Sequence, residues 1–480
     1  MTHMHVAGSI HADTLTPAPK WLQVPADVNR LETKLWSSTV RRGEDGVLRV
    51  GRVAVTEIAE QVGTPAYVID EVDFRARARA YADAFAGWDV YYAGKSFLAA
   101  GVVGWVAEEG LCLDVCSGNE LIVALAGGMD PARIGLHGNN KSVAELELAV
   151  DSGVGRIIVD SLTEIDRLAE ICAQRQKRAK VLVRVTAGVE AHTHEYIATA
   201  HEDQKFGLSI SGGQALAALR RCAENPHLDL RGIHSHIGSQ IFETAGFEVA
   251  IRRTLELHKQ LAEDTSVTLP ELDLGGGFGI AYTSADTPRS PEYLAGALQS
   301  LVARECRGLE IEMPHLSIEP GRAISGPPGM ALYTVGTVKQ VEVAPEAFRC
   351  YVSVDGGMSD NIRPALYGSE YSATVADRRS EAGPMLCRVV GKHCESGDIL
   401  VRDEFLPADI APGDLIAVPA AGAYSRSMAS NYNHALRPPV VSVRDGKVRT
   451  LIRRETLADL LGLDPGVDLA NLPAVERNDR

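Results

Sequence analysis

The feature that most constrains the fold is a regular alternation of short apolar runs with segments of helical pattern. The runs are rich in β-branched residues, which is typical of strands. They begin at Val90, Leu111, Arg133, Arg156, Lys180, Arg231, Glu271 and His315. Between the first five starts the spacing is 21 to 24 residues. Such alternation predicts parallel βαβ units, and eight of them predict a closed (β/α)8 TIM-like barrel rather than an open doubly wound sheet.

The segments between these strands carry helix-start signals. Ser142 and Ser161 stand where helices are expected to begin, with Glu145 and Glu164 three residues further on. A serine followed by glutamate at that distance predicts a capping box at each helix start.

The rhythm changes near Pro328. Beyond it, β-rich runs alternate with Gly, Pro and Asp turns, which predicts an all-β domain, a β-barrel or sandwich, at 329–480. We expect the barrel at 66–328. Residues 1–65 are expected to form a leader and a segment that packs on the β domain.

Composition limits the possible functions and locations. The 480 residues carry a formal net charge of -15, which argues against a nucleic-acid partner. Neither a targeting signal nor a membrane-spanning run is visible, so a cytoplasmic protein is expected. Eight cysteines are too few for a disulfide scaffold. Cys112 and Cys116 are interpreted as small core residues rather than metal ligands, and no metal site is predicted.

Functional side chains and glycines gather where the predicted strands end. They are Lys95, Ser117, His137, Asp160, Arg184, His236, the Gly275–Gly277 run and Glu319. In a barrel these positions meet at the rim formed by the carboxyl ends of the strands, which is where barrel enzymes keep their active site. We therefore expect an active site at this rim.

Lys95 lies in the segment Tyr92-Ala93-Gly94-Lys95-Ser96. Gly94-Lys95-Ser96 invites comparison with a phosphate-binding loop, but that motif needs a glycine where this chain has Asp89. A lysine sheltered by the rim has a lowered pKa and can form an imine with a carbonyl group. Taken alone, the motif is explained better by a merely structural or exposed lysine.

Three further motifs follow late barrel strands. Glu319-Pro320-Gly321-Arg322 is a rigid turn that can fix a carboxylate and a guanidinium, or an ordinary turn with a surface ion pair. Gly277 belongs to a GGGFG run whose backbone N–H groups can approach a phosphate. His236 and Ser239 lie in HSHIGSQ, where His236 can stack on a cofactor or be a core histidine.

The β domain has its own candidates. Cys394 and Glu395 stand together in a turn-rich segment, Arg363 and Tyr367 lie in NIRPALYG, and Tyr424 lies in GAYSRS. Each alone is ambiguous, since Arg363 also suits a surface and Tyr424 a core. Because none would reach the barrel rim of its own subunit as a matter of course, a site shared by two subunits is a hypothesis.

In combination, the motifs resemble the diaminopimelate decarboxylase family, within the alanine-racemase-like (fold-type III) pyridoxal-phosphate enzymes. Seven segments carry the resemblance in the expected order: YYAGKSFL, HSHIGSQ, GGGFG, EPGRAI, DGGMSDNIRPALYG, KHCESGD and GAYSRSMASNYN. The resemblance covers nearly the whole chain, from about Val47 to Asp464. The leader and the loop HTHEYIATAHEDQKFGL resemble the actinobacterial branch.

The resemblance implies pyridoxal 5'-phosphate as cofactor and decarboxylation of meso-2,6-diaminopimelate to L-lysine, the last step of lysine biosynthesis. Lys95 would bind the cofactor as a Schiff base, Glu319 would face its ring nitrogen and His236 would stack on its ring. The implied phosphate-binding residues are Ser239, Gly277, Gly321 and Tyr424. The implied substrate-binding residues are Arg322, Arg363, Tyr367, Glu395 and Tyr424.

The resemblance also implies a homodimer in which Cys394 and Glu395 complete the partner's site. Cys394 is the first candidate for the proton donor and Lys95 the second. Arg363 argues for diaminopimelate over ornithine or lysine. Two rival classes remain, a Schiff-base aldolase and a catalytically silent homologue; the first leaves Glu319 and the β domain unexplained, and the second usually lacks residues retained here.

Overall fold

The computed structural model describes residues 18–188, 205–344 and 347–468. The chain forms two compact units. The barrel unit comprises residues 75–280 and 287–324, and the β unit comprises the residues before 75, 281–286 and those from 325 on. Most of the segment HTHEYIATAHEDQKFGL, which resembles the actinobacterial branch, lies outside the described residues.

The barrel unit is a closed ring of parallel strands, as the sequence predicted. The strands are β5 (Asp89–Ala93), β6 (Cys112–Val115), β7 (Ile134–Leu136), β8 (Arg156–Val159), β9 (Ala179–Thr186), β11 (Leu228–Ser235), β12 (Glu271–Asp273) and β13 (His315–Ile318). Pairing of β13 with β5 and of β8 with β9 closes the ring. A two-residue strand, β10 (Leu208–Ser209), pairs with β9 outside it. Closure makes the first and last strands neighbours, so Lys95 and Glu319 follow adjacent strands.

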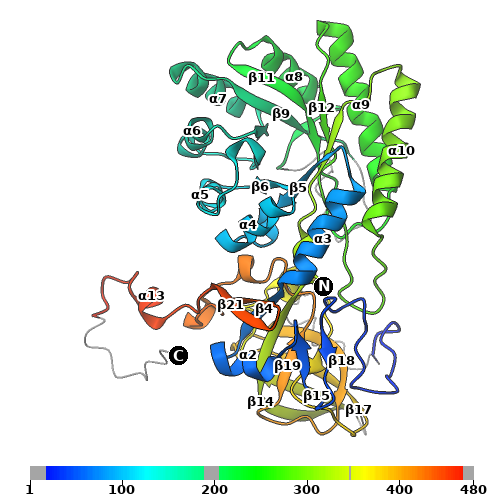
Figure 1. Cartoon of the computed structure of the whole chain (residues 1–480), viewed down its shortest axis with the longest axis vertical. Helices are drawn as coiled ribbons and strands as arrows, with labels where there is room; N and C mark the ends of the chain where they lie inside the picture. Colours follow the sequence, from blue (N-terminus) through cyan, green and yellow to red (C-terminus); the bar gives the residue numbers. More distant parts are fainter. Residues whose placement is uncertain (1–17, 189–204, 345–346, 469–480) are drawn as a thin grey trace, which may run out of the picture. The chain divides into compact units, whose positions relative to one another are not determined.

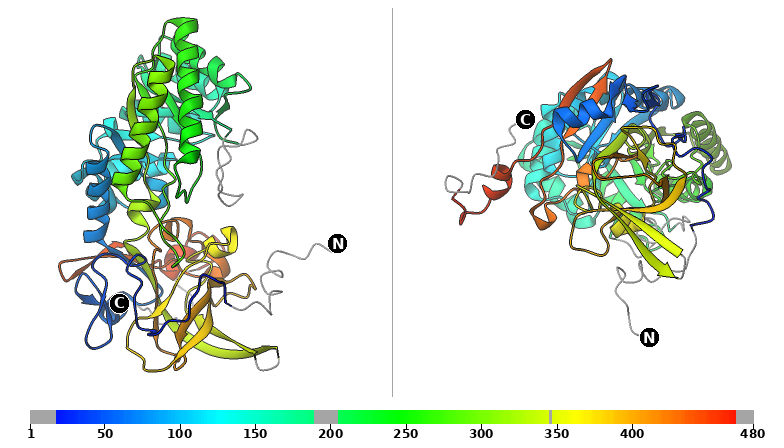
Figure 2. Two further views of the ribbon diagram at one scale, coloured as in Figure 1. Left: turned by 90° about the vertical axis from the view of Figure 1, so that its right-hand side faces the viewer. Right: turned by 90° about the horizontal axis from the view of Figure 1, so that it is seen from below.

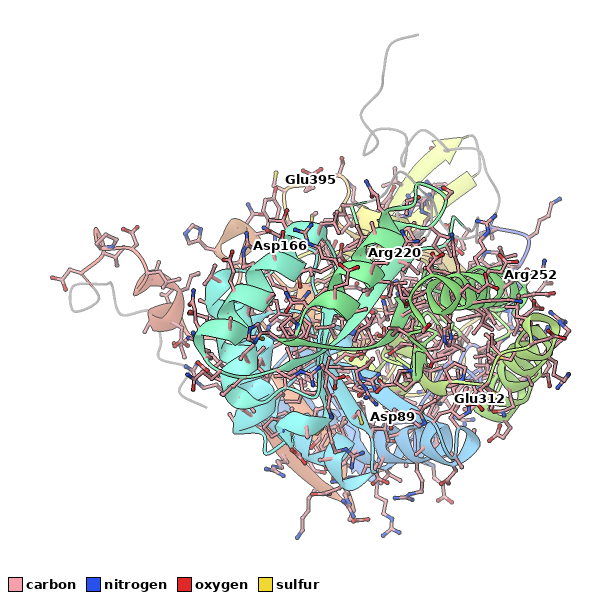
Figure 3. All side chains as sticks on the ribbon, turned by 90° about the horizontal axis from the view of Figure 1, so that it is seen from above. Asp89, Asp166, Arg220, Arg252, Glu312 and Glu395 are labelled. Carbon is pink, nitrogen blue, oxygen red and sulfur yellow. The ribbon has the colours of Figure 1, made fainter. Side chains whose placement is uncertain are left out.

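Helices surround the strands (Figures 1 and 3). They are α4 (Ala100–Glu108), α5 (Gly118–Ala126), α6 (Val143–Ser152), α7 (Leu162–Gln174), α8 (Gln214–Glu224), α9 (Ala245–Thr265) and α10 (Pro291–Leu309), with short turns η1 (Gly94–Ser96) and η2 (Pro131–Arg133). Two helices, α3 (Glu71–Ala84) and α11 (Arg322–Ser325), run across unit boundaries. Asp166, Arg220 and Arg252, labelled in Figure 3, lie on α7, α8 and α9 of the outer layer.

One of the two predicted capping boxes forms. The Ser142 side chain accepts a hydrogen bond from the Glu145 N–H, and the Glu145 carboxylate accepts one from the Ser142 N–H. Helix α6 therefore begins with a complete capping box. Ser161 caps α7 by accepting from the Glu164 N–H. The Glu164 carboxylate instead lies 2.7 Å from Lys141 Nζ, because both side chains are buried and charge pairing outweighs a second cap bond.

The opposite ends of the barrel strands hold a buried arginine. Arg156 lies within 3.5 Å of the carboxylates of Asp89, Glu271 and Asp273 and donates to Ser317 at 3.1 Å. Its guanidinium also lies 4.4 Å from the ring centre of Tyr91. Asp89, which is labelled in Figure 3, is the residue that excluded a phosphate-binding loop, and it has a structural partner in Arg156.

The β unit is built on a second sheet. In the order β18-β17-β15-β14-β4-β20-β21 its strands are Ile399–Pro407, Pro384–Val390, Ala347–Val354, Gly329–Ala344, Ala66–Asp70, Val440–Arg444 and Lys447–Ile452. Beside them β19 (Leu415–Val418) pairs with β14 and with β16 (Thr374–Val375). The long antiparallel pair of β14 and β15 is seen in Figure 2. A small sheet, β1 (Arg41–Arg42), β2 (Leu48–Val50) and β3 (Val53–Ala54), and short helices complete the unit: α2 (Val55–Val62), α12 (Arg363–Tyr367), η3 (Arg426–Met428), η4 (Tyr432–His434) and α13 (Leu457–Leu461).

The predicted barrel boundary at residue 66 differs from the structure. Strand β4 (Ala66–Asp70) pairs with β14 and β20 of the β unit instead of beginning the barrel unit. All five of its residues are buried. A strand buried on both faces has the same continuous apolar pattern in either sheet, so only its pairing partners reveal where it belongs.

The segment before β4 contributes to the hydrophobic core of the β unit. Leu35, Trp36, Leu48 and Ile58 are buried in one cluster with residues of β14 and β19. Apolar contact of this kind stabilises the N-terminal segment on the sheet. Within the described residues, no helix is both long and apolar enough to cross a membrane.

Candidate active site

A cavity of about 270 Å³ opens at the carboxyl ends of the barrel strands. It is lined by Ala93, Gly94, Lys95, Asp114, Cys116, His137, Gly138, Asn139, Arg184, Phe206, His234, His236 and Glu319. Five of the rim residues predicted from sequence are in this lining, so the rim prediction is confirmed for them. Ser117 instead caps α5, and Asp160 accepts from the Gly207 N–H at 2.7 Å.

Lys95 projects into the cavity from a rigid turn. It lies in η1, directly after β5. The neighbouring Ser96 is fully buried and donates to the Ala93 carbonyl at 2.9 Å, while the Tyr92 hydroxyl donates to the Phe97 carbonyl at 2.7 Å. Lys95 itself is exposed. The prediction that the barrel rim buries this lysine is therefore wrong for the protein without a bound ligand. Exposure towards the cavity leaves its amine accessible to a carbonyl ligand.

Glu319 is buried between two histidines. Its Oε1 atom lies 3.0 Å from His234 Nε2 and 3.2 Å from His137 Nε2. Burial by itself raises the pKa of Glu319, but His234 and His137 lower it to well below its usual range, so the residue is ionised. Yet none of these contacts is aligned as a hydrogen bond, and within the described residues Oε1 has no such partner. A buried carboxylate oxygen without a donor suits a ligand that supplies one.

Asp114 adds a second carboxylate to this cluster. Its Oδ1 atom lies 3.2 Å from His137 Nε2. Burial and the neighbouring Glu319 raise the pKa of Asp114 to about 7. Burial lowers the pKa of His137, but Glu319 and Asp114 raise it to about 9. Gly135, the middle residue of β7, leaves room for this carboxylate, because a Cβ at that position would fall 2.5 Å from Asp114 Oδ1.

His236 is held in its neutral form. Its Nδ1 atom accepts a hydrogen bond from the Gly276 N–H at 3.2 Å. Burial, with Lys95 and Arg184 nearby, lowers its pKa to well below the usual value. A neutral ring fixed at its edge can stack on an aromatic ligand in the cavity.

The glycine run and Ser239 lie side by side. The Ile241 N–H donates to the Gly277 carbonyl at 2.9 Å, and Gly277 has φ +105°. A Cβ on Gly276 would fall 2.2 Å from the Glu319 carbonyl oxygen, and one on Gly277 2.3 Å from the Gly238 carbonyl oxygen. Close backbone packing alone therefore requires these glycines.

Arg322 and Gly321 lie on the same side of the site. Arg322 Nη2 donates to Ser239 Oγ at 2.9 Å. A Cβ on Gly321 would fall 2.9 Å from the Ala93 side chain, so the turn after β13 packs closely on the strand that leads to Lys95. The structure thus brings together Lys95, His236, Ser239, Gly277, Glu319, Gly321 and Arg322 within the barrel unit.

Arg363 forms a second cluster, in the β unit. It is 2% exposed at the start of α12. Its Nη1 atom donates to the hydroxyls of Tyr282 at 2.6 Å and Tyr371 at 2.9 Å, and its guanidinium lies 5.9 Å from the Tyr424 ring centre. Tyr367 ends the same helix and is partly buried.

Cys394 and Glu395 are exposed on an anchored loop of the β unit. The Asp398 carboxylate accepts from the N–H groups of Met358 at 2.5 Å and His393 at 2.8 Å. His393 in turn bonds Ser359 at 2.8 Å and Asn433 at 3.0 Å. The loop backbone is thereby fixed while both candidate side chains remain exposed; Figure 3 shows Glu395 on its loop.

Sequence reasoning missed several residues of these clusters. Asp114 faces the cavity, and its signal was a charged side chain inside an apolar strand. Tyr282 and Tyr371 carry no local signal. His137, His234 and Glu319 also have the spacing of metal ligands, within 4.8 Å of one another, and the predicted absence of a metal stays a prediction.

Comparison with known proteins gives consistent matches. Residues 71–326 match the family model "Pyridoxal-dependent decarboxylase, pyridoxal binding domain". The diaminopimelate decarboxylase of Mycobacterium tuberculosis is 52% identical over 90% of this chain and 98% of its own length. That of Corynebacterium efficiens is 49% identical over 94% and 99%.

Among solved structures, the diaminopimelate decarboxylase of M. jannaschii in complex with L-lysine is similar. It has a TM-score of 0.83 and 30% identity, and the alignment covers 91% of this chain and 99% of that one.

Proposed function

This chain belongs to the diaminopimelate decarboxylases, within the pyridoxal-dependent decarboxylases, and we propose that it converts meso-2,6-diaminopimelate into L-lysine and carbon dioxide with pyridoxal 5'-phosphate. The observation that carries the proposal is one cavity that holds both an accessible lysine, Lys95, and an ionised buried carboxylate, Glu319. This reaction is the last step of lysine biosynthesis.

Residues of the barrel unit, together with Tyr424 of the β unit, fit this cofactor. Lys95 would hold its carbonyl carbon, Glu319 its ring nitrogen and His236 one face of its ring. Ser239, Gly277, Gly321 and Tyr424 would hold its phosphate. When bound, the cofactor supplies an electron sink for the charge left by the departing carboxylate. The Oε1 atom of Glu319 has no hydrogen-bond donor among the described residues, and the protonated ring nitrogen of the cofactor would supply one.

The chain's own residues have distinct tasks. Ionised Glu319 would keep a proton on the ring nitrogen of the bound cofactor, because a carboxylate with a low pKa favours the charged form of its partner. Neutral His236 stacks without adding a positive charge beside Lys95. Cys394 is the first candidate to deliver the proton that replaces the lost carboxylate, and Lys95 is the second.

Residues of the β unit, together with Arg322 of the barrel unit, select the substrate in this proposal. Arg363, Arg322 and Tyr367 bind the carboxylate that the reaction leaves in place, and Glu395 binds the amine beside it. Tyr424 contributes to the same region. A guanidinium is suited to this task since it binds a carboxylate through two parallel hydrogen bonds.

We also propose a cytoplasmic homodimer with shared sites. Cys394 and Glu395 are exposed on a fixed loop, which suits side chains offered to another subunit. The domain roles follow: the barrel holds the cofactor, and the β domain selects the substrate and forms the dimer.

One assay tests the function. Purified protein should absorb in the visible range, lose that band with borohydride, and release carbon dioxide from meso-diaminopimelate faster than from lysine or ornithine. The Glu319→Gln variant should keep the fold and lose activity by about 100-fold or more, since a neutral amide no longer holds the ring proton. A colourless protein excludes the cofactor, and a preference for ornithine overturns the role of Arg363. A coloured but inert protein indicates the silent homologue.

A further inference from the structure

Arg363 is a buried cation whose partners in the described residues are all neutral. Its guanidinium donates three hydrogen bonds, to the hydroxyls of Tyr282, Tyr371 and Ser369, the last at 3.2 Å from Nη2. No carboxylate of the described residues forms an ion pair with it. The buried Arg156, by contrast, has three carboxylates within 3.5 Å. A buried charge without a counter-charge is costly, so the fold keeps Arg363 ready for an anion.

The two tyrosines fix the orientation of this guanidinium. An arginine only donates hydrogen bonds, so both hydroxyls accept from Nη1. The Tyr282 and Tyr371 rings meet edge to face at 5.0 Å between their centres, and the guanidinium lies 4.9 Å from the Tyr282 ring centre. The contacts hold the guanidinium in place on several sides without neutralising its charge.

The remaining donors match a carboxylate. A guanidinium has five N–H groups, of which three are used by these hydroxyls. The two left are on the adjacent atoms Nε and Nη2. Two N–H groups on adjacent nitrogens are the arrangement that binds a carboxylate with two hydrogen bonds. An aspartate or glutamate in place of either tyrosine would neutralise the cation and remove this binding capacity.

We propose that Tyr282 and Tyr371 are specificity-determining positioning residues, which hold Arg363 for the carboxylate that decarboxylation leaves in place. The inference rests on the proposed function and deepens it, because it names how a diamino-dicarboxylate is told from a diamine. The product L-lysine retains that carboxylate, whereas cadaverine has the same amine spacing without it. The tyrosines therefore contribute to binding of L-lysine and not of cadaverine.

The experiment compares two inhibitors on the holoenzyme. In Tyr282→Phe and Tyr371→Phe the ring and its packing remain and only the hydroxyl is lost. The inhibition constant of L-lysine should rise about ten-fold in each variant, while that of cadaverine stays within about two-fold. The KM for meso-diaminopimelate should rise in parallel with the inhibition constant of L-lysine. The change in kcat should be smaller, because the chemistry occurs at the other end of the substrate.

Tyr67→Phe is the matched control. Tyr67 is buried in the same unit, and its hydroxyl donates to the Asp360 carbonyl at 2.5 Å without touching Arg363. Its loss should leave the ratio of the two inhibition constants unchanged. Equal weakening of L-lysine and cadaverine in the Arg363 tyrosine variants, no weakening at all, or the same shift in Tyr67→Phe would each overturn the proposal. If the wild type releases no carbon dioxide from diaminopimelate, the proposed function fails, while calorimetric binding of L-lysine and cadaverine still tests the tyrosines.

Discussion

At the scale of single residues, the ionisation of Glu319 depends on its neighbours. Two histidines surround its Oε1 atom, and Asp114 lies behind His137. With His137 protonated and both carboxylates ionised, Glu319, His137 and Asp114 carry one net negative charge. The cationic ring nitrogen of the proposed cofactor would neutralise that charge, so the protein presents complementary charge before the ligand binds.

His137 should make the stability of the cofactor-free protein depend on pH. Its pKa is raised from 6.5 to about 9, so its protonated form stabilises the fold fully below pH 6.5 and this stabilisation is lost as pH rises to 9. The loss is at most about 3 kcal/mol. The difference in unfolding free energy between wild type and His137→Gln should shrink over this range in urea titrations. If this difference in unfolding free energy grew with pH instead, the pKa of His137 would be lowered rather than raised, which would exclude a stabilising protonated His137.

At the scale of elements, the ends of the barrel strands divide two tasks. The carboxyl ends form the cavity with Lys95 and Glu319, while Arg156 at the start of β8 joins side chains from β5, β12 and β13. Because these strands are far apart in sequence, the ion-pair network helps to fix the ring in register. Stability and chemistry are thus separated along the same strands.

Replacing Arg156 by Met should destabilise the protein strongly. The substitution leaves Asp273 buried without its cation, which costs about 3–5 kcal/mol. The control is Arg453→Met, which breaks an exposed pair with Asp459 and should cost less than about 1 kcal/mol. Urea unfolding measures both. Equal effects of the two substitutions would show that the buried network contributes no more than a surface pair.

At the scale of the whole molecule, the two clusters belong to different units. The barrel unit holds all the residues proposed to bind the cofactor except Tyr424, and the β unit holds Tyr424, Arg363 with its tyrosines and the exposed Cys394 and Glu395. In the proposed dimer, one active site needs Lys95 from one subunit and Glu395 from the other. An oligomer of this kind can be tested by mixing defective subunits.

Complementation should restore activity. Lys95→Ala and Glu395→Ala should each be inactive or nearly so alone. After unfolding and refolding together in equal amounts, half of the dimers are mixed, and each has one intact site. The mixture should therefore recover about a quarter of wild-type activity. The absence of any recovered activity would exclude a site shared between subunits. The control is a mixture of Lys95→Ala with Glu319→Gln. Both of these changes fall in the barrel unit, so no mixed dimer gains an intact site.

The amino-acid sequence by itself determined the barrel, the order of its strands and the rim positions of Lys95, His236 and Glu319. These follow from local patterns, since strand and helix periodicities and the rule that parallel strands end at one rim need no knowledge of distant contacts. Motif order along the chain also sufficed for the family resemblance.

Only the tertiary structure decided which sheet β4 joins, that Asp114 and His137 lie behind Glu319, and that Tyr282 and Tyr371 surround Arg363. A buried strand has the same apolar pattern in any sheet, and a tyrosine can serve in a core or in a site. Tyr282 is 81 positions from Arg363 in the chain, and such a pairing is fixed by packing between distant segments rather than by any local pattern.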